Sequence, residues 1–532
     1  MSGGVSGRTC GAVRHFSALR KYDRNAFLDS LEVKTFSEQE ISNAFERLQV
    51  QAQDGDGDGV VSPSDISDVI RTHSQGELSS EEITLVTNEI LKDLVEKNTG
   101  LITRESFGSG MREMGGRFDK RVKPLVACYL ITGTTIGIIV PCMPLLVSEL
   151  NISSSQFGLI VSSFGLAKLL GNIPSSHYVN VIGRKPLFFS GLGLASVAIG
   201  GIGLSLNPAF GYPWIVCCRL LTGLGVSAIV AGGNMMVADI STYLNRTQTQ
   251  APLMSAWQMG MIAGPGVGGL LIDTFGLANT YYSVGGGMLL VSAISQLFVQ
   301  ETKPHVFGLN KKGKSVLKVP KEQLSNSVQT AFASWRRLLH GNQELKNVVL
   351  LNGSYWAVMS GVQLTMLPLL MVNPVLNMSA SQIGFTFISL SLVSLAMAQP
   401  LAYLADNYNK NYMFVAGCAL LGGSSIFVPF ATSPEQLAML MVPFAVGSTV
   451  MQNVPTAHVV NICGAEDAPQ AMSLLRTVGD LGLIVGAATS GMLASLTSVE
   501  TVIQGQGSIL FATLAYIGYQ KHLTAEAAKK QL

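Results

Sequence analysis

The feature that most constrains this chain is a series of apolar segments that begins near Pro124 and continues almost to the C-terminus. Each segment has roughly 20 residues, enough for a helix to cross the ~30 Å hydrocarbon core of a bilayer. Only 13% of the residues are charged and 48% are hydrophobic, so a soluble chain of this size could not cover its surface with polar groups. The pattern predicts an all-α, polytopic membrane protein.

The apolar segments fall into two groups of six, one on each side of a long polar stretch. This predicts twelve membrane helices in two six-helix halves, over 120–300 and 346–520, joined by a basic loop over 301–345 and followed by a tail over 521–532. The expected spans are 124–147, 153–178, 186–206, 212–241, 250–275, 279–299, 346–371, 379–405, 411–432, 435–463, 469–496 and 501–519.

Lys and Arg are distributed unevenly among the connections between these segments. The connections after odd-numbered segments contain none, whereas those after even-numbered segments hold Arg184, Lys185, Arg246 and Lys410, besides the basic central loop. Because positively charged connections stay on the cytosolic side, or on the matrix side in an organelle, both termini are expected there.

The N-terminal segment over 1–35 is basic at its start. It contains Arg8, Arg14, Arg20 and Lys21 and no acid before Asp23. This composition resembles a mitochondrial presequence and is equally typical of a disordered basic tail. Two locations therefore stay open, the mitochondrial inner membrane and the plasma or vacuolar membrane.

Glycines repeat between the two halves. At one constant offset, Gly225, Gly260 and Gly264 of the first half recur as Gly447, Gly482 and Gly486. A constant offset over separate segments indicates two related halves, an architecture in which the substrate site lies between the halves near the midplane.

Three motifs stand out in the apolar region. They are Gly183-Arg184-Lys185 with its second-half counterpart Asp406, Arg219-Leu-Leu-Thr-Gly223 in the fourth span, and a glycine-proline string of Gly260, Gly264, Pro265, Gly268 and Gly269 in the fifth. Small residues let helices approach closely, and proline allows a bend. This combination suits a helix that moves against its neighbour.

These motifs resemble those of the major facilitator superfamily, and within it the twelve-helix branch of drug:proton antiporters. The resemblance covers roughly residues 120–520 and implies that Arg219 takes part in proton coupling. It also implies that the glycine-proline string is the antiporter signature and that Gly183, Arg184 and Lys185 belong to a conformational loop motif. The chain departs from the family pattern at Asn180-Val181, where the family has Asp-Arg.

Charged side chains inside apolar spans are costly unless they are paired or hydrated. Arg219 is expected to face inward with a functional role. Lys168 and His458 are weighed in the same way, although Lys168 could snorkel to the interface and His458 could be a hydrogen-bonded core residue. No carboxylate occurs in the middle of a span. An anionic or neutral solute is therefore expected at least as much as a cationic drug, and proton coupling stays open.

Three further charged residues lie near span ends. Arg476 and Asp480 are four residues apart on one helix face, and this spacing predicts a local structural ion pair. Asp239, near the end of the fourth span, is expected to act as a gate residue.

The soluble region over 36–115 contains the spacing of a calcium-binding EF-hand loop. The expected ligands are Asp54, Asp56, Asp58, the Val60 carbonyl, Ser62 and Asp65, at loop positions 1, 3, 5, 7, 9 and 12, with Gly59 at the turn. Hard oxygen donors at these positions wrap a Ca²⁺ ion. The last ligand is usually Glu, and the shorter Asp65 predicts weaker Ca²⁺ binding or a site that also accepts Mg²⁺.

A second, degenerate hand is expected to follow the first. Val95, Lys97, Thr99 and Ser106 stand at its ligand positions, so no ion is expected there. Its expected role is pairing, with Ile102 placed beside Val61 in a short two-stranded link between the hands.

These observations predict a secondary active transporter of a small organic solute that works by alternating access and is modulated by calcium. Two alternatives stay open: a transport-dead calcium receptor that keeps the membrane fold as an anchor, and a facilitative or anion-exchange carrier without proton coupling. No enzyme constellation and no nucleic-acid partner are expected, and the chain is expected to be monomeric.

Overall fold

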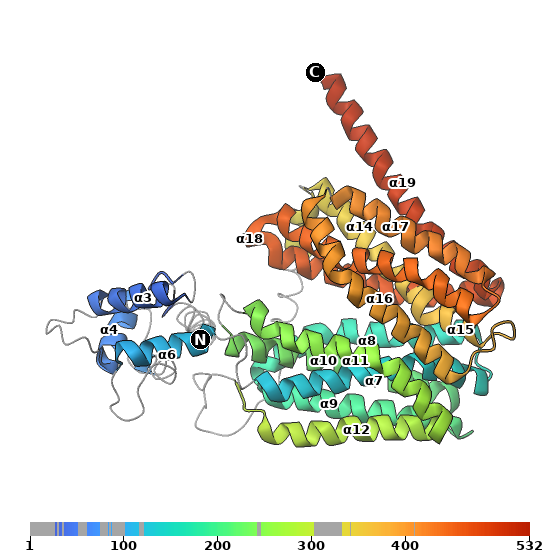
Figure 1. Cartoon of the computed structure of the whole chain (residues 1–532), viewed down its shortest axis with the longest axis horizontal. Coiled ribbons are helices and arrows are strands. Elements are labelled where there is room, and N and C mark those ends of the chain that lie inside the picture. The colour runs from blue at the N-terminus through green and yellow to red at the C-terminus, as the bar shows by residue number, and fades with distance from the viewer. Residues whose placement is uncertain are drawn as a thin grey trace, which may run out of the picture.

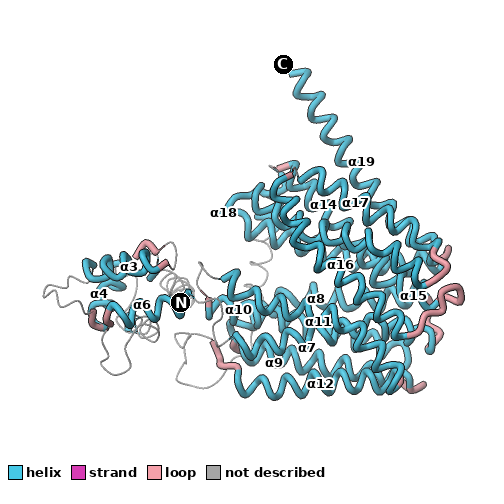
Figure 2. The backbone as a smooth tube through the Cα atoms, in the orientation of Figure 1, coloured by secondary structure: helices cyan, strands magenta, loops and turns pink. Residues whose placement is uncertain are grey.

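The computed structural model describes residues 27–28, 31–33, 37–51, 61–74, 83–84, 87, 102–115, 122–241, 246–302, 332–340, 342–408 and 410–531. This part of the chain consists almost entirely of helices joined by short connections, as the tube in Figure 2 shows. The prediction of an all-α chain is therefore confirmed for the described residues.

The first half contains six long helices. They are α7 (Lys123–Glu149), α8 (Ser154–Val181), α9 (Arg184–Ile202) with the short η2 (Gly203–Leu206), α10 (Gly211–Ile240), α11 (Arg246–Phe275) and α12 (Leu277–Phe298). The turn between α8 and α9 passes through Gly183, whose φ of 116° lies in a region that favours glycine.

The second half begins with α14 (Gln343–Val358), which continues through a π-helical segment, η3 (Met359–Met366), into α15 (Leu367–Val372). Its other helices are α16 (Ala380–Asn407), α17 (Lys410–Phe427) with η4 (Val428–Phe430), α18 (Pro434–Leu496) and α19 (Val499–Gln531). The helical backbone of α18 runs through the connection expected between the tenth and eleventh spans, and these two spans nevertheless recur within it as Pro434–Cys463 and Gln470–Leu496.

Matching helix starts relate the two halves. Ser153 and Gln156 form a capping box at the start of α8, and Ser379 and Gln382 form the same box at the start of α16. Two residues before each cap, Asn151 and Asn377 have positive φ values of 50° and 40°. The Asn-x-Ser-x-x-Gln pattern is thus a repeated turn into a membrane helix.

Nine helical segments in the described chain are long and apolar enough to cross a membrane. They correspond to nine of the expected spans, and α18 supplies two of them, Pro434–Cys463 and Gln470–Leu496. The other three expected spans coincide with α11, α12 and α19, which are helical but are not among the nine. A total of twelve spans therefore stays a prediction.

Each half has its own apolar core, which contains Phe188 and Tyr281 in the first half and Tyr355 and Phe444 in the second. Large apolar side chains are also exposed on the flanks, among them Leu297 and Phe298 of α12. A membrane protein needs such exposure where its helices face hydrocarbon.

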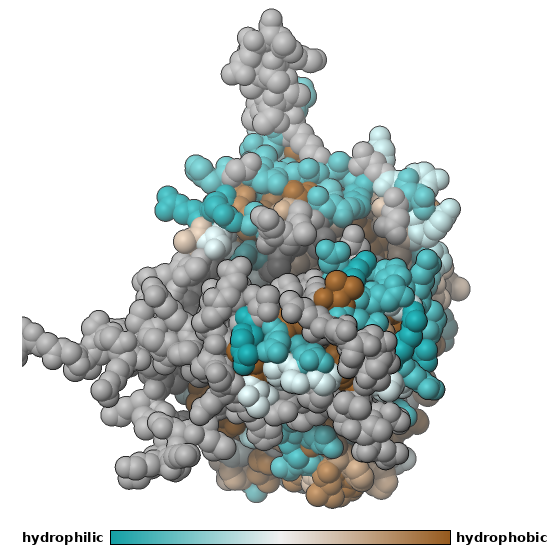
Figure 3. Space-filling model, turned by 90° about the vertical axis from the view of Figure 1, so that its left-hand side faces the viewer, coloured by the Kyte–Doolittle hydropathy of each residue, from teal (hydrophilic) through white to brown (hydrophobic). Residues whose placement is uncertain are grey.

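The two halves meet at one end of the molecule and diverge toward the other (Figure 1). We call the meeting end, with the α7–α8 and α15–α16 connections, the distal end. The opposite end, with the α8–α9 connection, is the basic end. Figure 3 shows the molecule from this side, with the N-terminal region nearest the viewer, and many of the described residues seen there are hydrophilic.

A third apolar cluster lies in the N-terminal region, around α3 (Glu38–Gln51), α4 (Pro63–Ser74) and α6 (Arg104–Gly115). The rings of Phe45 and Phe107 lie 5.3 Å apart within it. Val61 and Ile102 form an antiparallel bridge, with N–H···O distances of 3.0 and 2.9 Å. The predicted pairing of these two residues is confirmed.

Candidate translocation site

A stripe of three side chains runs along one face of α8. Phe164, Lys168 and Asn172 are spaced four residues apart, so they lie one above the other on the same side of the helix. Phe164 contacts Arg219 of α10, and Lys168 contacts Asp480 of α18. The stripe therefore links groups from both halves about midway along α8. The expectation that no carboxylate lies in the middle of a span is wrong, because Asp480 lies there within Gln470–Leu496.

The Lys168 ammonium and the Asp480 carboxylate form an ion pair across the two halves, at 2.9 Å. Asn172 donates to the other Asp480 oxygen at 3.5 Å. The side chains of Lys168 and Asp480 are 30% and 17% exposed, so both are mostly withdrawn from solvent. The expected local pair of Arg476 with Asp480 is wrong, because Asp480 turns toward α8 while Arg476 is exposed.

Arg219 is buried inside the first half, with 8% of its surface exposed. Its guanidinium carbon lies 4.7 Å from the centre of the Phe164 ring, a cation–π contact. Its Nε is buried with no hydrogen-bond partner among the described residues. The expectation that Arg219 faces inward is confirmed, while its role stays a prediction.

The glycine-proline string of α11 packs against two helices at once. A Cβ atom on Gly264 would lie 2.5 Å from the Thr134 carbonyl oxygen of α7. On the other side, a Cβ atom on Gly269 would lie 2.5 Å from the Ala380 carbonyl oxygen of α16. Gly260 and Gly268 also approach the α7 backbone. The string thus joins α11 both to its own half and to the other half.

Contacts between the halves close the distal end. Asp273 of α11 accepts a hydrogen bond from Ser381 of α16, beside the Gly269 contact. On the α8–α18 side, a Cβ atom on Gly158 would lie 2.5 Å from the Ala487 carbonyl oxygen. Toward the basic end, Met259 of α11 is exposed. The described halves therefore touch at the distal end and separate toward the basic end (Figure 1).

The loop motif at the basic end forms a buried polar cluster within the first half. Arg184 is 2% exposed and donates from Nε to Asp239 at 2.7 Å. The backbone N–H groups of Arg184 and Lys185 donate to the Glu301 carboxylate at 3.1 and 3.2 Å, where the α9 N-terminus favours negative charge. Glu301 follows α12, and sequence reasoning missed it because the contact is purely tertiary.

The remaining predicted residues lie apart from this stripe. His458 contacts Glu344 at 3.0 Å, near the start of α14, and its ring lies 5.7 Å from Phe414. The side chain of Asp406 and the residues Asp54, Asp56, Asp58, Gly59 and Val60 lie outside the described part. Ser62 and Asp65 are described, and they cap α4 reciprocally, with a 2.7 Å bond from the Ser62 N–H to the Asp65 carboxylate.

Comparisons with known proteins agree with this architecture. The family model of the Major Facilitator Superfamily matches residues 125–373 and 349–531. An uncharacterised MFS-type transporter of Methanocaldococcus jannaschii is 22% identical over 76% of this chain and 100% of its own length. Multidrug resistance protein 2 of Bacillus subtilis is 24% identical, over 68% of this chain and 85% of its own length.

Among solved structures, a bacterial homologue of the human lysosomal transporter Spinster, in an inward-facing and occupied conformation, aligns with a TM-score of 0.62. It is 14% identical and covers 75% of this chain and 96% of its own, a likeness that shows the fold. With the family model covering most of the chain and two helical halves around a shared polar stripe, the chain belongs to the major facilitator superfamily and is a membrane transporter, not an enzyme.

Proposed function

We propose that this transporter is a secondary carrier that moves a small organic solute bearing an anionic group by alternating access. The observation that supports this most is the inter-half ion pair of Lys168 and Asp480, one turn below the ring that covers Arg219. The relatives named as multidrug resistance proteins support transport of an organic solute.

The charge balance of the stripe favours an anion. It brings together two cations, Lys168 and Arg219, and one carboxylate, Asp480. A partly buried cation without a full complement of acceptors gains most from a ligand that brings negative charge. A solute carboxylate, sulfonate or phosphate could compete with Asp480 for Lys168, and this exchange would loosen one contact between the halves.

The contacts between the two halves are consistent with alternating access. The distal end is closed by close backbone packing at Gly269 and by the Asp273–Ser381 contact, whereas the helices of the two halves diverge toward the basic end (Figure 1). Opening the distal end requires these contacts to break while contacts form at the basic end. The Lys168–Asp480 pair lies between the two ends, where a bound solute would influence both.

The test is uptake by the full chain reconstituted into liposomes, with carboxyfluorescein as the anionic probe and ethidium as the cationic probe. We expect the anionic probe to be taken up faster, and Lys168→Met to abolish its uptake while Lys410→Met does not. Uptake of ethidium alone would overturn the proposal of an anionic solute but would still support a carrier of organic solutes. No uptake of either probe, or of a wider panel of organic solutes, would favour a transport-dead receptor.

We also propose that the N-terminal module binds Ca²⁺ and modulates transport. The proposal rests on the ligand spacing from Asp54 to Asp65 and on the Val61–Ile102 bridge, which matches the expected link between paired hands. Ser62 and Asp65 lie beside each other at the start of α4, and both offer the oxygen atoms that Ca²⁺ and Mg²⁺ prefer.

Calorimetric titration of the full chain with Ca²⁺ and Mg²⁺ tests this second proposal. We expect one Ca²⁺ per chain, with a Kd above about 1 μM because Asp65 replaces the usual Glu. Asp54→Ala should remove the binding, whereas Asp68→Ala, on the exposed side of α4 beside Arg71, should not. Heat of binding that persists in Asp54→Ala would contradict the site. Uptake that is indifferent to Ca²⁺ would restrict the ion to a structural role.

A further inference from the structure

A pocket of about 430 Å³ lies where the helical segment 332–340 rests on the basic end of α18. Trp335, Leu338 and Leu339 pack this segment against the core of the second half. Arg337 fixes it further through an ion pair with Asp467 at 2.5 Å. The pocket is therefore bounded by an anchored element of the loop between the halves.

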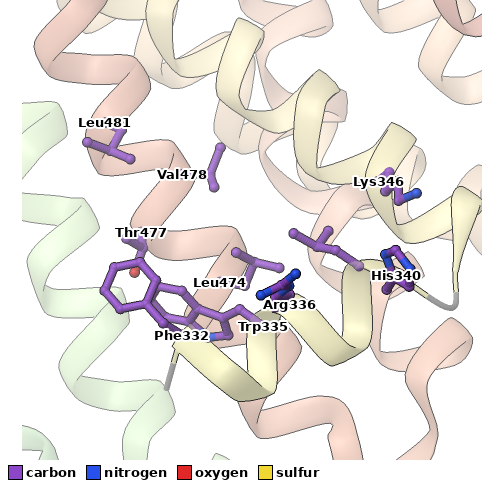
Figure 4. A pocket seen from close by; sticks show the side chains of 10 residues that line it. Phe332, Trp335, Arg336, His340, Lys346, Leu474, Thr477, Val478 and Leu481 are labelled. Carbon is purple, nitrogen blue, oxygen red and sulfur yellow. The ribbon is translucent and has the colours of Figure 1, made fainter. Parts of the chain in front are cut away.

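The pocket separates charge from apolar surface. Figure 4 shows Lys346 and His340 at one end, Leu481 at the other, and Arg336 and Leu474 between them. None of the ten described residues that line it is acidic. Arg336 and Lys346 are exposed, and neither forms an ion pair with a described acid. One end thus suits an anion, and the other suits an alkyl chain.

An apolar track continues from the pocket along α18. Leu481, Val485, Met492 and Leu496 follow helical spacing on one face, and each is between 46% and 73% exposed. The track reaches the distal end, where the halves touch through another face of α18, at Ala487 and Gly491. The exposed face therefore lies on the outer flank of the bundle, which hydrocarbon surrounds in a membrane.

Trp335 adds a polar group to this arrangement. Its indole Nε1 is buried and has no hydrogen-bond partner in the described part of the chain. Trp favours the membrane interface, where one edge is apolar and its N–H meets a polar acceptor. The indole therefore suits a segment that lies at the membrane interface.

We propose that this pocket binds one anionic phospholipid, with its phosphate near Arg336 and Lys346 and one acyl chain along the α18 track from Leu481 toward Leu496. Basic pockets beside membrane helices hold anionic head groups, and the adjoining apolar face accounts for a lipid rather than a water-soluble anion. Such a lipid would tie the segment 332–340 to α18. The proposal concerns binding and does not depend on the identity of the transported solute.

The test uses native mass spectrometry of the purified full chain, titrated with dioleoylphosphatidylglycerol or dioleoylphosphatidylcholine. We expect the first phosphatidylglycerol to bind about tenfold more tightly than the first phosphatidylcholine. Arg336→Gln combined with Lys346→Gln should remove this preference. The matched control is Lys410→Gln, which removes a lysine from the start of another second-half helix, and it should leave the preference intact.

Two further measurements separate a lipid in this pocket from diffuse attraction. Thr477→Trp should fill the cavity without changing its charge. It should weaken binding of the first phosphatidylglycerol as strongly as Arg336→Gln combined with Lys346→Gln does. Glycerol phosphate, the head group alone, should not displace the lipid at equal concentration. An unchanged preference in the double variant, an equal loss in Lys410→Gln, or displacement by glycerol phosphate would overturn the proposal.

Discussion

Lys168 of α8 and Asp480 of α18 form an ion pair at 2.9 Å that joins the two halves of the transporter. Both side chains are largely withdrawn from solvent, so the loss of either partner leaves an uncompensated charge. Asn172 supports the carboxylate from one turn further along α8. Such an ion pair can stabilise one conformation of the transporter, and its lysine can also bind the solute. These two roles predict different effects of mutation.

A charge exchange separates the two roles. Lys168→Ala and Asp480→Ala should each reduce carboxyfluorescein uptake at least about tenfold, because each leaves a partly buried charge unpaired. The exchanged variant, Lys168→Asp with Asp480→Lys, restores the pair but moves the cation to α18. If Lys168 binds the solute, uptake stays low although the melting temperature recovers. Recovery of both uptake and melting temperature would show that the ion pair only stabilises the contact between the halves.

The crossing of α11 and α16 predicts a conformational defect. A Cβ atom on Gly384 would overlap the Pro265 carbonyl oxygen of the other half. Gly384→Ala should therefore push the distal ends apart and destabilise the closed distal end by about 1–3 kcal/mol. Cysteine accessibility at position 381 in a Ser381→Cys background should rise, and uptake should fall.

The control for this substitution is Gly286→Ala in α12, where a Cβ atom meets nothing within 4 Å. That variant should leave both accessibility and uptake unchanged. Equal effects of the two substitutions would show that alanine acts through helix propensity rather than through the contact between the halves.

The buried cluster at the basic end predicts a stability effect within the first half. Arg184→Ala leaves Asp239 without its 2.7 Å partner and should lower stability by about 3 kcal/mol. Glu301→Gln keeps the shape but removes the charge that the Arg184 and Lys185 N–H groups bind, so a smaller loss is expected. Thermal melting in detergent measures both. A larger loss for Glu301→Gln would contradict the ranking.

Local patterns predicted much of this architecture. Helical spans, the inward position of Arg219 and the Val61–Ile102 bridge follow from hydropathy and from spacing along the chain, which act over a few residues. The partner of Asp480 could not be predicted in this way. Arg476 is four residues away along the same helix, whereas Lys168 comes close only when the two halves pack together. Glu301 was missed for the same reason, since the α9 N-terminus meets it only after α12 has folded back.

The last prediction concerns Arg219, whose burial and contact with Phe164 indicate that the shape of its guanidinium matters as well as its charge. Arg219→Ala should abolish uptake of the anionic probe. Arg219→Lys keeps the charge but loses the planar guanidinium that stacks on the ring, so partial activity is expected. Phe164→Leu should resemble Arg219→Lys, since it removes the same contact from the other side. Arg476→Ala removes an exposed cation of α18 and should have little effect. Full activity of Arg219→Ala, with correct folding shown by an unchanged melting temperature, would remove Arg219 from the translocation site and leave Lys168 as its cation.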